Sequence, residues 1–141
     1  MSILDWFTSK SPEQAREDSQ RYDQWAFPYG TPQKDAMLGL LAQFFPKEDK
    51  KLSLVTYLIV KEAYCGNFRT TASMEELSHS ERLKLAMKAL KKKLTGPQRK
   101  QIPMYLALIL ADAQVDELLQ YPSTTQLQES AQQLQQEIAA L

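Results

Sequence analysis

The sequence is poor in the residues that build most metal and cofactor sites. Its 141 residues include one cysteine, Cys65, and one histidine, His79. A single cysteine cannot form an intramolecular disulfide, and this pair cannot supply a Cys/His metal site. A glycine-rich phosphate-binding loop is also missing. We therefore predict no metal ligands and no cofactor, and the lone thiol fits a reducing compartment.

Long apolar segments and a secretory signal are also lacking. The longest apolar runs, at 54–60 and 104–111, fall well short of the roughly 20 residues that span a bilayer. The first ten residues carry an acid at position 5 and lack the long apolar stretch of a signal peptide. These features predict a cytoplasmic protein that does not interact with membranes.

Glycine is scarce and no useful stretch alternates apolar and polar residues, so strands are not expected. Only four residues are glycine, and helix-forming residues dominate the chain. The length corresponds to about one average domain. We predict a single all-α domain over 1–141, a bundle of five or six helices. It consists of an N-terminal arm with a polar helix at 1–31, a central bundle at 32–121 and a heptad-patterned helix at 123–141.

Capping patterns mark the expected helix boundaries. A serine followed three residues later by Glu or Gln is typical of a helix start, whereas glycine and proline mark many ends. Three such patterns begin at Ser11, Ser78 and Ser123. The predicted helices cover 12–25, 32–45, about 50–65, about 79–94, 104–120 and 124–141, and a proline-containing linker covers 97–103.

Helical spacing assigns an inward face to each central helix, and residues 104–110, apolar on nearly every side, should form the most buried helix. The predicted inward residues are Met37, Leu38, Leu41, Phe44 and Phe45 in the second helix, Leu52, Val55, Leu58, Ile59 and Ala63 in the third, and Leu83, Ala86, Met87, Leu90 and Leu94 in the fourth.

Few side chains are candidates for catalysis. His79 is interpreted as a solvent-facing residue at a helix start, because its neighbours Ser78 and Ser80 cannot form a triad at that spacing. Cys65 lies at the C-terminal end of the predicted helix over about 50–65, where the helix dipole disfavours a thiolate, and is interpreted as a small buried apolar residue. Asp112 and Asp116 lie four residues apart on one predicted helical face, where two acids can share a proton or bind a hard cation. We assign no catalytic residue, and an enzyme using the Asp112/Asp116 face stays an alternative.

The net charge of zero conceals a strong separation of charge. Residues 51–100 contain eleven basic and four acidic side chains, whereas residues 101–141 contain five acids and no base. The stretch 82–100 contains eight Lys or Arg and no Asp or Glu. On a helical wheel, lysines form a stripe beside a leucine face. The candidates for polyanion binding are Lys84, Lys88, Lys91, Lys92, Arg99 and Lys100.

Three interpretations of this stripe stay open. The lysines can solvate the helix and complement its dipole, which favours cations in the last turn. They can match the acids of 101–141, within the chain or across a subunit interface. They can also bind the phosphates of a nucleic acid. Because the protein as a whole carries no basic excess, we favour solvation and the charge match over nucleic acid.

Two further surfaces are candidates for binding a protein partner. Trp25, Phe27 and Tyr29 lie in an aromatic segment that either anchors the N-terminal arm or contacts a partner. Leu127, Leu134 and Ile138 follow a short heptad pattern that either packs on the domain or forms a dimer seam. We predict a non-enzymatic intracellular protein acting through protein association or self-association, with nucleic-acid binding through 82–100 as the first alternative.

Overall fold

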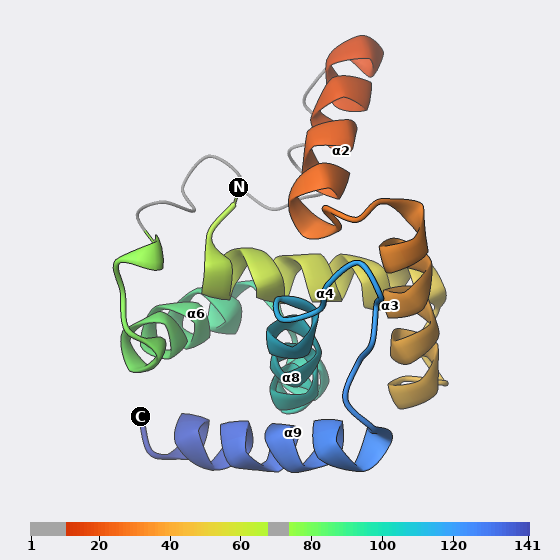
Figure 1. The fold of residues 1–141 in the computed structure, drawn as a ribbon. Coiled ribbons are helices and arrows are strands. Elements are labelled where there is room, and N and C mark those ends of the chain that lie inside the picture. Colours follow the sequence, from red (N-terminus) through yellow and green to blue (C-terminus); the bar gives the residue numbers. More distant parts are fainter. Residues whose placement is uncertain (1–10, 68–73) are drawn as a thin grey trace. The chain divides into compact units, whose positions relative to one another are not determined.

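The all-α class is confirmed. The structure, a computed structural model, describes residues 11–67 and 74–141, and these residues form seven helices and no strand (Figure 1). Contacts group the chain into two compact units, divided between Ile59 and Val60. Each unit is described separately below, and the single domain with its three-part division stays a prediction. In the described ranges, no helix is both long enough and apolar enough to cross a membrane.

The first unit contains α2 (Pro12–Ala26), α3 (Thr31–Phe44) and most of α4 (Lys50–Cys65). The Ser11 hydroxyl accepts a hydrogen bond from the Gln14 backbone N–H at 3.1 Å, which confirms the predicted helix start. Gly30 adopts a φ of 82° between α2 and α3, a left-handed conformation that suits glycine. Met37 and Leu41 of α3 are buried, as their spacing predicts.

The predicted inward face of α4 is wrong. Leu52 is 44% exposed, and Val55, Leu58 and Ile59 are only half-buried. The hydroxyls of Ser53 and Thr56 donate to backbone carbonyls of α4 itself, so these polar side chains are buried at little cost. Large aromatic rings then supply the buried area that the leucines were expected to supply. The buried residues of α4 are Ser53, Thr56, Tyr57, Val60 and Tyr64.

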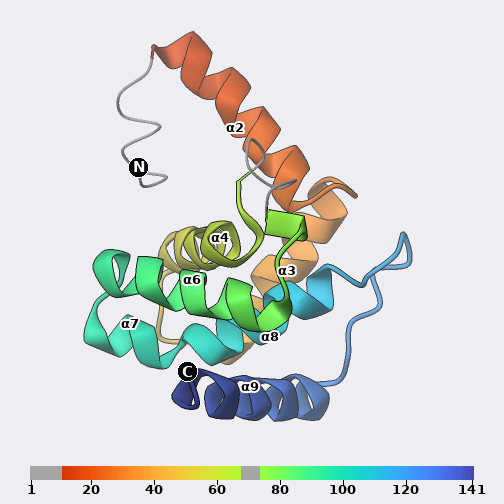
Figure 2. The same cartoon turned by 90° about the vertical axis from the view of Figure 1, so that its left-hand side faces the viewer.

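The second unit contains the end of α4 together with α6 (His79–Lys93), α7 (Gly96–Lys100), α8 (Ile102–Asp112) and α9 (Thr124–Ala139). α8 is apolar around most of its circumference and seven of its eleven residues are buried, as predicted. α9 packs against α8 (Figure 2). The predicted inward residues Leu83, Ala86, Leu90 and Leu94 of α6 are buried.

The predicted linker at 97–103 is wrong, because most of it is helical. Thr95 and Gln98 form a reciprocal capping box that starts α7, and α8 begins at Ile102. Pro97 and Pro103 lie in the first turns of these helices, where a missing backbone N–H costs nothing. The prolines therefore start helices instead of separating them.

The predicted helix over 104–120 ends early, at Asp112. The Asp116 carboxylate accepts the Leu118 backbone N–H at 2.9 Å, and this local bond competes with a helical one. Leu119 then turns the chain with a left-handed φ of 52°. Residues 113–123, which we call the acidic loop, connect α8 to α9. Asp112 and Asp116 thus do not share a helical face, which removes the geometry behind the Asp112/Asp116 enzyme hypothesis.

The heptad pattern of α9 packs inside the second unit. Ser123 and Gln126 form the predicted capping box. Leu127, Ala131 and Leu134 are buried, whereas Ile138 is half-buried. Because α9 packs against α8, the seam covers an apolar helix of its own chain.

Two leucines of α6 test this account of the core. Leu90 is fully buried and Leu85 is exposed. We expect Leu90→Ala to lower the free energy of unfolding by about 2 to 5 kcal/mol and Leu85→Ala to change it by less than about 0.5 kcal/mol. Urea denaturation followed by circular dichroism measures both. Equal losses for the two variants would contradict the assigned inward face of α6.

Candidate functional site

The most extensive charged surface lies on α6 and α7. Lys84, Lys88, Lys91 and Lys92 are exposed on α6, outside its buried leucine face, and Arg99 and Lys100 are exposed on α7. Figure 2 shows these two consecutive helices. We call these six cations, together with the neighbouring Leu85, the basic surface. Leu85 is 49% exposed. Glu81 is exposed at the N-terminal end of α6, so the surface is basic but not free of acid.

None of the six cations forms an ion pair with another described residue. The five acids of 101–141 do not pair with these cations. Asp112 bonds to Tyr121, Glu137 bonds to His79, and the remaining three are exposed. The described residues therefore contain no internal charge match for the lysine stripe. A match between copies of the chain stays a prediction.

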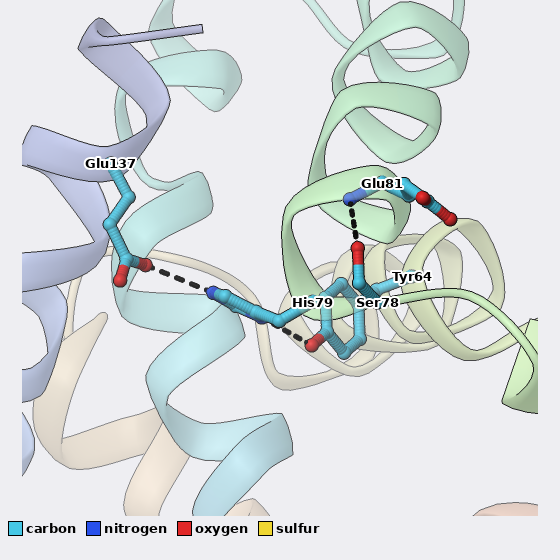
Figure 3. A network of polar contacts seen from close by, with 5 residues as sticks. All are labelled: Tyr64, Ser78, His79, Glu81 and Glu137. Atoms are coloured by element: carbon cyan, nitrogen blue, oxygen red, sulfur yellow. Dashed lines mark hydrogen bonds and ion pairs between the residues drawn. The ribbon is translucent and has the colours of Figure 1, made fainter.

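His79 is the centre of a polar network that the sequence did not suggest. Its Nδ1 lies 2.5 Å from the Tyr64 hydroxyl, and its Nε2 lies 3.0 Å from Oε2 of Glu137 (Figure 3). A carboxylate only accepts, so a neutral His79 carries its proton on Nε2 and donates it to Glu137, while Nδ1 accepts a hydrogen bond from the Tyr64 hydroxyl. The three residues connect the end of α4, the start of α6 and the end of α9.

The start of α6 is positioned by its own cap. The Ser78 hydroxyl accepts the Glu81 backbone N–H at 3.2 Å, as the capping pattern predicts, and this places His79 in the first turn (Figure 3). Glu137 is 58 residues further along the chain. No local pattern relates the two residues, so the sequence predicts only a solvent-facing histidine.

The order carboxylate, imidazole, hydroxyl is also that of a hydrolase triad. Here the hydroxyl cannot act as a nucleophile. Tyr64 is buried, and this burial raises the pKa of its hydroxyl, an effect that the nearby Arg82 opposes. Both ring nitrogens of His79 are engaged, as they also are in a triad, so the burial of the Tyr64 hydroxyl is what distinguishes this arrangement. The network therefore acts as a tie between helices.

A cavity of about 320 Å³ lies beside this network in the second unit. Leu110, Leu127 and Leu134 contribute apolar lining, while Gln114 and Gln133 contribute amides. His79 and Glu137 border the cavity, and no lysine or arginine does. The lining can accept a small apolar group. It also includes Ser130, whose hydroxyl forms no hydrogen bond to His79 or Glu137 in the described structure.

A second polar contact holds the acidic loop. The Tyr121 hydroxyl donates to Oδ1 of the buried Asp112 at 2.6 Å. Burial, followed by this hydrogen bond, raises the pKa of Tyr121 above its ordinary value of 10.0. Asp112 is therefore held by structural contacts, and Asp116 is exposed in the loop.

Cys65 and the acidic residues provide no other reactive centre in the described ranges. Cys65 is half-buried, and burial raises the pKa of its thiol, while Lys61 and Arg82 oppose this shift. A reactive thiolate is thus disfavoured, mainly by burial, with no need for the helix-dipole effect expected from the sequence. The described His, Cys, Asp and Glu side chains include no group of three that could hold a metal ion.

The candidate partner-binding residues differ widely in accessibility. Phe27 is buried and stacks on Tyr57 with ring centroids 6.1 Å apart, whereas Trp25 is half-buried. Tyr29 is 42% exposed. In α9, Leu127 and Leu134 are buried and Ile138 is half-buried. Their role in binding a partner stays a prediction, and Tyr29 is the most accessible of the six.

Comparison with known proteins finds no match to this chain among protein-family models, curated protein sequences or solved structures. The functional argument below therefore depends on the residues described above.

Two acids of α9 test the His79 tie. Glu137 bonds to His79, whereas Glu129 is exposed and has no described partner. We expect Glu137→Gln to lower the free energy of unfolding at pH 7 by about 0.5 to 1 kcal/mol, because a partly exposed charge-assisted bond is lost. Glu129→Gln should change it by less than about 0.3 kcal/mol. If urea titrations give the same value for both variants, the tie contributes nothing to stability.

Tyr121 gives a prediction that depends on pH. We expect Tyr121→Phe to lower the free energy of unfolding by about 1 kcal/mol at pH 7, because the bond to Asp112 is lost. The raised pKa means that the folded protein keeps the Tyr121 proton at a pH where the unfolded chain releases it. Its stabilising contribution is therefore complete below about pH 10 and is lost as the pH rises further.

The difference between wild type and Tyr121→Phe should accordingly shrink as the pH rises above about 10. Urea denaturation at several pH values measures this difference. Tyr29→Phe is the matched control, because Tyr29 is exposed and its stability effect should stay below about 0.5 kcal/mol. A pH-independent difference for Tyr121→Phe would contradict the assigned pKa shift.

Proposed function

We propose that this protein is a non-enzymatic binding protein that associates with another protein through the basic surface of α6 and α7. One observation carries the proposal: six exposed cations have no ion-pair partner among the described residues, and a half-exposed leucine lies beside them. Such a combination of an apolar centre and surrounding charge is typical of a protein interface.

The contacts of the titratable residues support the non-enzymatic part. His79, Tyr64 and Glu137 are engaged with one another, and Asp112 is engaged with Tyr121. The hydroxyl that His79 contacts belongs to the buried Tyr64, and the hydroxyl that Asp112 contacts belongs to Tyr121, whose pKa is raised, so neither contact supplies an activated nucleophile. We also propose that the protein works in the cytoplasm, on the basis of its single unpaired cysteine.

The chemistry of the surface favours an acidic protein over a nucleic acid. α6 and α7 contain no aromatic residue that could stack on a base. Most of the six cations are lysines, which act as point charges and do not read base edges as arginine does. The protein as a whole is neutral, so it lacks the long-range attraction that most nucleic-acid-binding proteins have.

The basic surface is also more accessible to a partner than the aromatic segment and the α9 seam that the sequence suggested. Phe27, Leu127 and Leu134 are buried, so a partner could reach them only after local unfolding. Tyr29 and Leu85 are the accessible apolar residues near the candidate surfaces. Of these, only Leu85 lies beside unpaired charge.

Nucleic-acid binding through the same six cations is the second candidate function. It is favoured by the same absence of ion pairs in the described part of the chain. Contacts to phosphates alone would make the affinity fall steeply with salt, with a slope of roughly 0.7 per contacted phosphate for a single strand.

Charge reversal tests both candidates. We expect a variant with Lys84→Glu, Lys88→Glu and Lys92→Glu to bind fluorescent poly-L-glutamate at least about tenfold more weakly than wild type at low salt, because attraction becomes repulsion. A variant with Lys47→Glu, Lys50→Glu and Lys51→Glu has the same charge change at exposed lysines elsewhere and should bind as wild type. Fluorescence anisotropy measures the affinity.

Two outcomes of this experiment would change the conclusion. Equal weakening by both variants would show that binding reflects net charge and not the basic surface. A single-stranded RNA of about 20 nucleotides that binds much more tightly than poly-L-glutamate, with the salt slope given above, would favour the nucleic-acid function.

A further inference from the structure

The chain carries an acidic counterpart of its own basic surface. In the acidic loop, Asp116 and Glu117 are exposed next to Leu118. Leu118 is 72% exposed, the most of any large apolar side chain in the described ranges. Isolated exposed leucines are common and indicate nothing alone. Here the leucine is adjacent to two exposed acids, and the six cations of the basic surface form no ion pair with another described residue.

The loop presents Leu118 in a defined conformation. The Leu118 backbone N–H donates to Oδ1 of Asp116 at 2.9 Å, and the Leu119 N–H donates to the Asp116 carbonyl at 3.0 Å. Leu119 has a left-handed φ of 52°, which a branched side chain adopts only at a cost. The hydrogen bond of Tyr121 to Asp112 holds the end of the loop. Little ordering is therefore needed before the loop can dock.

The loop and the basic surface are complementary in composition. Each has one exposed leucine, Leu118 or Leu85, with acids beside the first and lysines beside the second. Within the chain, no described ion pair joins them. Figure 2 shows the loop between α8 and α9 projecting at the right of the second unit, away from α6. A loop from another molecule can reach the surface that its own loop does not.

We propose that the basic surface binds the acidic loop of a second copy of this chain. Leu118 packs against Leu85, and Glu117 faces Lys84 and Lys88 of the other copy. This inference rests on the proposed function and names its partner. The net charge of zero supports it, because two copies do not repel each other as they approach.

Other exposed acids fit the basic surface less well. α2 alternates Glu13, Arg16, Glu17 and Arg21, so any approach brings like charges together. Glu129 of α9 is flanked by exposed polar residues and has no exposed apolar neighbour in the sequence. Among the described residues, the acidic loop places two exposed acids directly before the most exposed leucine, with no lysine between them.

The interface should be weak and sensitive to salt, because exposed ion pairs contribute little and are screened. Sedimentation velocity of the full chain over a concentration series, at about 50 mM and about 300 mM salt, measures the association. We expect self-association that weakens at least about threefold at the higher salt. A protein that stays monomeric at several hundred micromolar in low salt overturns the inference.

Charge exchange between two variants provides the decisive test. Glu117→Lys alone places a lysine loop against a lysine surface, and Lys88→Glu alone places an acidic loop against a weakened surface. Each variant alone should associate at least about tenfold more weakly than wild type. An equimolar mixture should associate again, because each loop then meets an opposite charge at position 88 of the other variant.

Matched variants separate this result from a loss of folding or from general charge effects. Circular dichroism and the recovery in the mixture show that both single variants are folded. Glu129→Lys makes the same charge change outside the loop and the basic surface, so it should associate as wild type does, and Leu118→Ser should weaken association while leaving the charge pairs in place. A loss of association in Glu129→Lys as large as in Glu117→Lys, or no recovery when Glu117→Lys is mixed with Lys88→Glu, overturns the inference.

The proposed function can fail independently. If poly-L-glutamate binds the basic surface but wild type does not self-associate, the function stands and the second copy is not the partner. If wild type self-associates and the charge exchange succeeds, the basic surface is a protein-binding surface even if poly-L-glutamate binds poorly. If neither binding nor self-association occurs, both proposals are wrong.

Discussion

The second unit is organised by the need to cover α8 on nearly every side. Its residues from Ile102 to Ile109 are mostly apolar and buried, and leaving them in water would oppose folding. α9 meets this need with a narrow seam of Leu127, Ala131 and Leu134, and its other residues can be Gln, Ser and Glu. α6 likewise buries one leucine face. The strong separation of charge is thus compatible with a stable core, because the charged residues occupy the sides that packing leaves outward.

Polar contacts across long sequence distances complete this arrangement and occupy the groups that resemble catalytic residues. Burying a hydroxyl or a carboxylate requires a hydrogen-bond partner. Tyr64 finds one in His79, and Asp112 finds one in Tyr121. The same interactions therefore connect helices that are distant in the sequence, and the hydroxyls that take part in them have raised pKa values.

Features set by a few neighbouring residues could be predicted from the sequence, and features set by distant contacts could not. The caps at Ser11, Ser78 and Ser123 are confirmed because each needs only its own first turn. The prediction of the inward face of α4 was wrong because Tyr57 and Tyr64 are buried in place of the leucines beside them. The prediction that α8 continues to residue 120 was wrong because the Asp116 carboxylate accepts the Leu118 N–H and Leu119 adopts a left-handed φ. The partnership of His79 with Glu137 depends on how α9 packs, which no local pattern contains. The lysine stripe was visible in the sequence, whereas its lack of partners was not.

Ion pairs between these charges would contribute more across an interface between molecules than within one chain. An exposed ion pair within a chain adds little stability, because it restricts two long side chains in a solvent that screens them. The same pair across an interface contributes to specificity and to the rate of encounter, because like charges in any other orientation repel. A neutral chain with basic α6 and an acidic loop therefore gains little by pairing its own charges. By leaving them unpaired, it keeps two complementary surfaces accessible, each with a leucine that water solvates poorly.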